Sequence, residues 1–216
     1  MNLSKLFQTQ KVLDQKIYDR FPGLKEEPWD WKILALLTEL GECANEWRGF
    51  KKWSDDREPR VDVFVLKKEF QHLHITQTGA YEYQLRDEFG KVIFDDVTDH
   101  HHDRRNMLLE EYVDCLHFIL SIGNDIRVTD VNVVEMGDYT KESTTKTFVY
   151  LNNDVWDVYK SVESPAASLR LESHYELLFA RFVGLGELQL GFNWKDVEQA
   201  YFEKNEINHA RQTEGY

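Results

Sequence analysis

The sequence Thr-Glu-Leu-Gly-Glu-Cys-Ala-Asn-Glu-Trp, residues 38–47, continues a strongly apolar run over residues 31–37. The run predicts a buried helix, and Glu39 and Glu42 share one face of it because they are three residues apart. Two carboxylates beside an apolar run either face solvent or face inward, where a cation must offset their repulsion. The choice between these two interpretations depends on the rest of the chain.

A second pair of acids stands in a second apolar helix. Helical periodicity over residues 107–120 includes Glu111 and Asp114, again three apart. Two such helices packed antiparallel would gather four carboxylates at one point, which is destabilising unless cations occupy it. Oxygen ligation with room for water suits Mg²⁺, or Mn²⁺, better than Zn²⁺. Since Mg²⁺ usually binds substrate phosphates as well, the sequence predicts a phosphate ester or anhydride as substrate.

Composition and charge argue against several classes of protein. A net charge of −13 over 216 residues disfavours a general DNA-binding protein or one that binds anionic membrane surfaces. No apolar run approaches the roughly 20 residues of a membrane span, and the N-terminus lacks a signal-peptide pattern. Cys43 and Cys115 fit a reducing compartment better than a disulfide framework. We therefore expect a soluble cytoplasmic protein with no nucleic-acid or membrane partner.

Helical periodicity recurs along most of the chain. Besides the two acid-bearing helices, over 28–48 and from residue 107 onward, it predicts helices over 3–21, 154–162, 164 to about 190, and 193 to about 212. Residues 127–150 are predicted to form loop or irregular strand.

Between residues 54 and 105 the pattern changes to short alternating runs that predict strands. Turn signals separate these runs, so this segment is interpreted as a small β-rich insert. Its Asp-His-His-His-Asp tract, residues 99–103, has the residue types of a transition-metal site. A solvated loop is the favoured interpretation, because consecutive histidines do not easily face one ion.

The C-terminal segment carries charge complementary to the acids. Lys204, Asn208 and Arg211 are spaced at i, i+4 and i+7 and so share one face of the last predicted helix. A face with cations and an amide suits phosphate oxygens, and arginine adds bidentate contacts. The alternative is an ordinary solvated helix end, where basic residues favour the helix dipole.

Three segments together resemble the dimeric, all-α dUTPase family of phages, some bacteria and trypanosomatids. They are Glu39-Leu40-Gly41-Glu42 with Phe50-Lys51-Lys52-Trp53, Glu111-Tyr112-Val113-Asp114 with His117-Phe118, and Tyr201…Lys204-Asn205…Asn208…Arg211-Gln212…Gly215-Tyr216. The acid pairs are shared by the wider all-α nucleotide pyrophosphatases, whereas the C-terminal signature is more specific to dUTPases. The resemblance covers about half to two thirds of the chain.

The resemblance implies an all-α fold, a helical bundle of the nucleoside triphosphate pyrophosphatase type that forms a homodimer. Residues 1–216 would form a single dUTPase-like domain with the β-rich insert at 55–105. The implied reaction is Mg²⁺-dependent hydrolysis of dUTP, and of dUDP, to dUMP, with pyrophosphate released from dUTP.

The family's site residues are carried over to the matching positions of this sequence. The metal ligands would be Glu39, Glu42, Glu111 and Asp114, and Glu39 would also orient or deprotonate the attacking water. Glu110 and Asp114 would share a face too, but the family match favours Glu111. The phosphate-binding residues would be Lys204, Asn208, Arg211 and Tyr216.

The base and sugar contacts follow from the same resemblance. Phe118 matches a position that stacks on uracil, with His117 beside it, and Trp53 matches an aromatic residue near the sugar. Apart from the resemblance, Asn45 and Asn124 are candidate amides for hydrogen bonds to the base. A first-helix stretch around Gln10 and Lys11 is also similar to the family's.

One departure from the family is the insert of about 50 residues, because short members pass almost directly from the Trp53 position to the second acid pair. It could cover the pocket, mediate assembly or bind a protein partner. Two other functions stay open at this point. One is a related pyrophosphatase that prefers dCTP or a damaged nucleotide, and the other is an interaction protein that binds a regulator through the insert.

Overall fold

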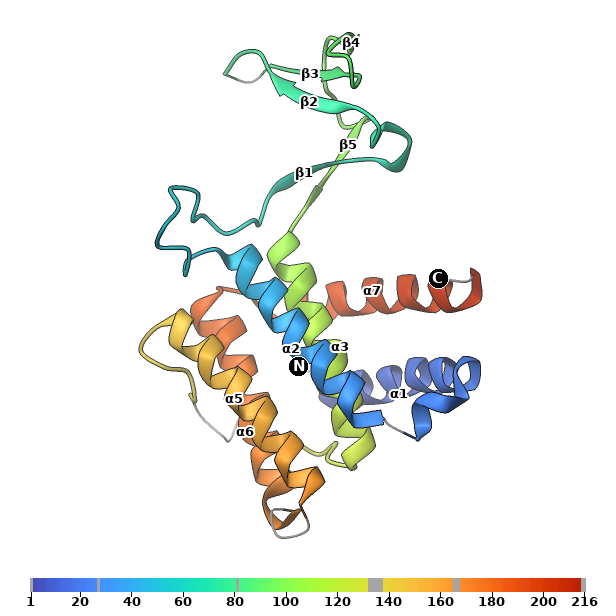
Figure 1. Ribbon diagram of the computed structural model, residues 1–216, viewed down its shortest axis with the longest axis vertical. Helices are drawn as coiled ribbons and strands as arrows, with labels where there is room; N and C mark the ends of the chain where they lie inside the picture. Colours follow the sequence, from blue (N-terminus) through green and yellow to red (C-terminus); the bar gives the residue numbers. More distant parts are fainter. Residues whose placement is uncertain (1, 27, 81, 132–137, 165–167, 215–216) are drawn as a thin grey trace. The chain divides into compact units, whose positions relative to one another are not determined.

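The computed structural model describes residues 2–26, 28–80, 82–131, 138–164 and 168–214 (Figure 1). The chain divides into two compact units. Residues 1–59 and 108–216 form a helical unit, and residues 60–107 form a β unit inserted between two of its helices. A helical fold with a small antiparallel insert is what the sequence predicted.

The helical unit is built from six long helices and three short helical turns among the described residues. They are α1 (Leu3–Arg20), η1 (Pro22–Lys25), α2 (Pro28–Trp47), α3 (Met107–Ile126), α5 (Thr144–Glu163), η3 (Ser168–Arg170), α6 (Leu171–Gly184), a π-helical turn η4 (Leu185–Gln189) and α7 (Trp194–Glu214). Side chains cap three of the starts, because Asn2 accepts a hydrogen bond from the Lys5 amide, Ser143 one from the Lys146 amide and Asn193 one from the Asp196 amide.

The helix α3 runs antiparallel to α2 through the centre of the helical unit. Lys32 near the start of α2 pairs with Asp125 near the end of α3, with 2.5 Å between Nζ and Oδ2. On its other faces α3 packs against α6, where the Tyr112 ring stacks on Phe182 with centroids 4.2 Å apart. Eleven of its twenty residues are buried, so α3 is the central element of the core. Its position fixes the acids that it carries.

The other helices pack in pairs around this centre. Helices α5 and α6 lie side by side, α5 also contacts α2, and α1 packs against α7 (Figure 1). The α1–α7 contact joins the first and last helices, and Lys16 Nζ donates to the His209 carbonyl and the Thr213 hydroxyl. The last predicted helix is thereby held against the first.

The sequence prediction was wrong at two helix starts. The helix expected from residue 164 begins at Leu171, because Ser164 is the C-cap of α5 and a 3₁₀ turn covers 168–170. Residues 144–150 were expected to form loop or strand, but they are the first turns of α5, which runs to Glu163. The Ser143 cap begins the helix, and Phe148 and Leu151 are buried against the core. Packing of this apolar face overrides the low helix propensity of a threonine-rich start.

The β unit contains two small antiparallel sheets. Strands β1 (Val63–Leu66) and β5 (His102–Arg105) form a ribbon that pairs Val63 with Arg105 and Leu66 with His102. A three-stranded sheet has the order β2-β3-β4, with β2 (His74–Gln77), β3 (Tyr83–Arg86) and β4 (Val92–Phe94), and a 3₁₀ turn, η2 (Lys68–Phe70), precedes it.

The histidine tract is not the solvated loop that was favoured. His101 and His102 are both buried, and His102 is the first residue of β5. The His101 ring packs on Phe70 and Phe94, with centroids 5.0 and 4.5 Å apart. The alternative, a metal site in this tract, has no support within the described ranges. The group of side chains that could hold an ion there consists of three carboxylates in the helical unit.

The search for membrane-spanning helices over the described residues finds none that is long and apolar enough.

Candidate active site

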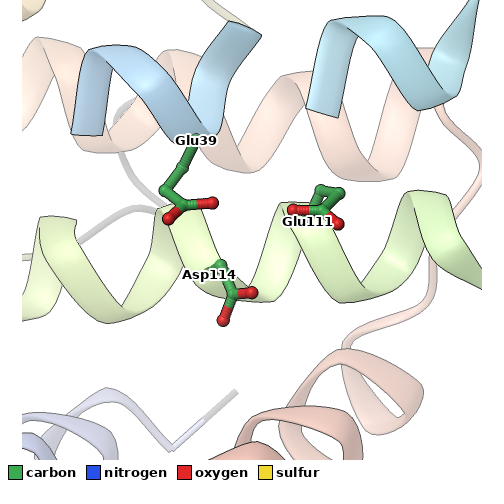
Figure 2. A group of neighbouring side chains, drawn as sticks. All are labelled: Glu39, Glu111 and Asp114. Atoms are coloured by element: carbon green, nitrogen blue, oxygen red, sulfur yellow. The ribbon is translucent and has the colours of Figure 1, made fainter. Parts of the chain in front are cut away.

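Three carboxylates meet where α2 faces α3. Glu39 reaches from α2 towards Glu111 and Asp114 of α3, as Figure 2 shows. One oxygen of each carboxylate lies within 4.8 Å of the corresponding oxygens of the other two. All three side chains are half-buried, so their charges are only partly screened by water. This acid cluster is formed by the antiparallel packing of the two helices.

Glu42 stands apart from the other three predicted ligands. It is exposed, and it does not belong to the group whose oxygens lie within 4.8 Å of one another. Its charge nevertheless contributes to raising the pKa of both Glu39 and Glu111. Glu42 therefore lies at the rim of the acid cluster.

The acids of the cluster are shifted towards their protonated forms. Burial, followed by the charges of Asp114 and Glu42, raises the pKa of Glu39 to about 7. The pKa of Glu111 is also raised to about 7, again by burial first and then by the Asp114 and Glu39 charges. When carboxylates repel one another in this way, their charged forms are unfavourable unless a cation binds beside them.

The face of α7 predicted from spacing lies beside the cluster. Lys204 Nζ donates to Asp114 Oδ2 at 2.5 Å, and Arg211 Nη1 donates to Asn208 Oδ1 at 3.3 Å. Burial raises the pKa of Asp114, and the Lys204 and Arg211 charges oppose that shift. The fourth residue assigned to this face, Tyr216, lies outside the described residues.

A cavity of about 240 Å³ opens next to the cluster, between α1, α2, α3 and α7. Two predicted base-contacting residues, His117 and Phe118, line it together with Asp114 and Asn208. The Phe118 ring meets Trp31 of α2 edge-on, with centroids 6.5 Å apart. The cavity therefore touches a metal-ligand candidate, a phosphate candidate and an aromatic wall.

Hydrogen bonds fix the orientation of the His117 ring in this cavity. Its Nδ1 lies 2.7 Å from Gln10 Oε1, which also accepts from the Tyr201 hydroxyl at 2.9 Å. Because an amide oxygen can only accept, Nδ1 carries the proton and Nε2 is left as an acceptor. Burial lowers the pKa of His117 to about 3, so the ring is neutral. Nε2 is buried and has no hydrogen-bond partner in the part of the chain that the structure describes.

Asp14 gives the cavity a second unpaired acceptor. Its Oδ1 accepts from Gln10 Nε2 at 2.8 Å, whereas its buried Oδ2 has no hydrogen-bond partner within the described ranges. Burial raises the pKa of this carboxyl. The sequence analysis pointed to the stretch around Gln10 but missed Asp14, Trp31 and Ser121, which also line the cavity. The one available signal was Gln10 and Asp14 at i and i+4 on the apolar face of α1.

Trp53 and Asn45 lie elsewhere. Trp53 is 76% exposed in the loop after α2 and meets Phe50 edge-on. Asn45 is exposed on α2, where its amide oxygen accepts from Lys51 and its amide nitrogen donates to Glu46. Neither residue lines the cavity beside His117, and Lys11 of α1 is exposed.

A helical unit with an acid cluster, a cationic helix face and an adjoining ring-lined cavity is typical of hydrolases that act on phosphorylated substrates. The family model for dUTPases matches residues 2–101 and 97–216 of the chain. The chain therefore belongs to the all-α dUTPase family, and it is a dUTP diphosphatase. No curated protein and no solved structure matches it.

Proposed function

We propose that the enzyme hydrolyses dUTP and dUDP to dUMP at the acid cluster, with Mg²⁺ as the required cation. The products would be pyrophosphate from dUTP and phosphate from dUDP. The observation that carries the proposal is the meeting of Glu39, Glu111 and Asp114 within 4.8 Å, with Lys204 of α7 bound to Asp114. Family membership supports the substrate, and this geometry supports the residues.

The donor set fits a hard divalent cation. All three gathered ligands are carboxylates, and magnesium prefers oxygen ligands and usually keeps several waters. The raised pKa values of Glu39 and Glu111 indicate that the negative charge here is not fully compensated by the protein. Glu42 at the rim would be the fourth ligand. A bound Mg²⁺ supplies positive charge to the phosphate oxygens and acidifies a water molecule.

The chain's own groups would carry out the remaining steps. Glu39 is our candidate for the base that orients and deprotonates the attacking water. Lys204, Asn208 and Arg211, with Tyr216, would hold the phosphates in line with the water. Lys204 would exchange its contact with Asp114 for the substrate's charge.

The cavity beside the cluster would hold the base. Phe118 and Trp31 form ring walls, and His117 Nε2 is an acceptor suited to the N3–H group of uracil. Stacking tolerates any base, so selectivity would come from this acceptor and its buried neighbours. Asn45 and Trp53 remain candidates for the base and sugar, since both side chains are exposed to an incoming substrate.

The functional form we propose is a cytoplasmic homodimer in which residues 1–216 act as one domain with an insert. Exposed apolar side chains gather on α2 and α5, with Leu34, Val149 and Trp156 at least half exposed. A shallow groove of about 160 Å³ lies on the same two helices. Apolar surface of this kind is typical of association sites. Light scattering on the purified chain and on Trp156→Lys tests this, and a monomeric wild type would contradict it.

Substrate preference is tested by pyrophosphate release from dUTP, dCTP, dTTP, dATP and dGTP, each with and without Mg²⁺. We expect turnover of dUTP alone, and only with the metal. Equal or better turnover of dCTP would contradict the uracil assignment. Activity retained after complete removal of divalent ions would contradict the metal assignment, while His117→Phe tests the base pocket separately through a raised KM for dUTP.

A further inference from the structure

A second cavity lies within the β unit, and none of its lining residues belongs to the acid cluster. Its volume is about 410 Å³, which is within the usual range for small-molecule sites. Rings and aliphatic side chains form most of its lining, and the polar residues in it are Asp99, His102 and Arg104. An apolar cavity with a few converging polar groups is the general form of a ligand site.

The strand register builds one wall of this cavity. Phe64 of β1 pairs with Arg104 of β5, and His102 shares the face of Arg104 because the two are separated by one residue. The Phe64 and His102 rings lie 4.4 Å apart, and the Arg104 guanidinium lies 4.6 Å above Phe64. Tyr83 of β3 supplies a further ring, 6.1 Å from Phe64.

The Phe64 ring is not buried in the core of the β unit. Leu73 and Leu85 are buried, and they form that core together with the rings of Phe70 and Phe94 around His101. In contrast, Phe64 remains 40% exposed on the cavity wall. Its aromatic surface is therefore available to a ligand.

The hydrogen bonding of His102 indicates what the ligand must offer. Its Nδ1 lies 2.8 Å from the Thr98 carbonyl oxygen, which can only accept, so Nδ1 carries the proton. The other ring nitrogen, Nε2, is buried without a hydrogen-bond partner among the described residues. Asp99 Oδ1 lies 3.8 Å from it, beyond hydrogen-bonding distance. A buried acceptor without a donor is unfavourable unless something fills its place.

Two acceptors 3.8 Å apart require a ligand edge with two N–H donors. An amino group on a flat ring, or an amino group beside a ring N–H, meets that requirement, and the ring would stack on Phe64 and Tyr83. Uracil has a single N–H group between two carbonyls and fits poorly. Adenine, guanine and cytosine each carry an amino group. Arg104, whose guanidinium also binds Asp62, stands at the rim as a donor for a carbonyl or phosphate.

We propose that the β unit binds an amino-bearing nucleobase, as a nucleoside or nucleotide, between Phe64, Tyr83 and His102. This site is separate from the one that hydrolyses dUTP and does not depend on the assignments made there. It would let the enzyme sense nucleotides other than its substrate.

Calorimetric titration of the full chain with 2′-deoxyadenosine, 2′-deoxyguanosine, 2′-deoxycytidine and 2′-deoxyuridine tests the proposal. At least one amino-bearing nucleoside should bind, and His102→Phe, which keeps a ring but removes the acceptor, should weaken that binding about tenfold. Asp99→Ala, at a fully exposed side chain, should weaken it several-fold without risk to folding. The matched control is His100→Phe, an exposed neighbour that should leave affinity unchanged.

Hydrolysis of dUTP should be the same in all three variants, which shows that the helical unit is intact. Weakening in either of the first two variants, with the control unaffected, supports the site. The proposal is overturned if none of the three amino-bearing nucleosides binds. It is also overturned if both pocket variants bind normally, or if the control loses affinity equally.

Discussion

The helical unit contains a buried acid–arginine pair and a cluster of three acids, and the two differ in how their negative charge is balanced. Asp154 of α5 is buried beside Arg181 of α6, whose Nε donates to it at 2.5 Å and whose Nη1 donates to the Tyr139 carbonyl at 2.6 Å. In the acid cluster, by contrast, like charges add to the effect of burial. The Asp114 and Glu42 charges help to raise the pKa of Glu39, and the Asp114 and Glu39 charges help to raise that of Glu111. The buried pair is neutralised by the fold itself, whereas the cluster keeps excess negative charge. That excess marks the cluster as the place for a cation.

The largest effect should come from the cluster. Asp114→Asn, or Glu42→Gln, should lower dUTP turnover more than about 100-fold. Losing a residue that only supports a metal ligand costs up to about 100-fold, and losing a ligand itself should cost more. The fold should remain intact, and without metal it should be equally or more stable because repulsion falls. Turnover at saturating Mg²⁺ and thermal unfolding measure the two parts.

Glu110→Gln is the matched control, since it removes a charge from the adjacent position of α3. Its turnover should stay near the wild-type value. Near-normal turnover of Asp114→Asn would show that Asp114 is not a metal ligand. A large loss of turnover in Glu110→Gln would show that Glu110, and not Glu111, is the ligand.

The buried pair should show the opposite behaviour. Arg181→Met leaves Asp154 buried without its cation and should cost about 3–5 kcal/mol of unfolding free energy. Replacing both partners, as Asp154→Leu with Arg181→Met, should recover most of that loss. Denaturant unfolding measures stability, and turnover per folded molecule should be little changed. If the single variant unfolds like the wild type, the contrast between the two groups fails.

A smaller effect should appear in the pH dependence of stability. The folded protein holds the Glu39 and Glu111 protons up to about pH 7, whereas an unconstrained glutamate releases its proton near 4.5. Since the folded state binds more protons between these values, stability of the metal-free protein should fall as pH rises from 4.5 through 7. Glu111→Gln should flatten the decline, and added Mg²⁺ should oppose it. A stability that rises over this interval in both proteins would contradict the shifts.

The smallest effect concerns Tyr216. Removing this residue alone should raise the KM for dUTP by about tenfold or less, the value of one hydrogen bond to a charged group. The free energy of unfolding should not change, because Lys16 already holds α7 through His209 and Thr213. Unchanged kinetics would exclude Tyr216 from the phosphate site.

Most of the fold could be predicted because its helices have strong apolar periods. One exception, residues 144–150, is instructive. Thr144, Thr145 and Thr147 are β-branched and disfavour helix, and only the burial of Phe148 against the core reverses that preference. Local sequence cannot report a packing partner on another helix.

The candidate site shows the same division. The acids and the α7 face are visible as fixed spacings within single helices, so the sequence reveals them. The cavity beside them is not visible, because its acceptor depends on His117 of α3 meeting Gln10 of α1 and Tyr201 of α7. The sequence also could not show that Glu42 lies outside the cluster. Glu39 and Glu42 share one face of α2, but that does not determine which of the two reaches the acids of α3.

The pairing of β1 with β5 has a consequence for the chain as a polymer. Val63 lies opposite Arg105, so the first and last strands of the insert bring its two ends side by side. The insert is part of the connection between the end of α2 and the start of α3. Because the entropy of closing a loop grows slowly with its length, this long connection costs little more entropy than a short one. Residues between the two paired ends could thus lengthen, shorten or be exchanged over evolutionary time with little strain on the acids.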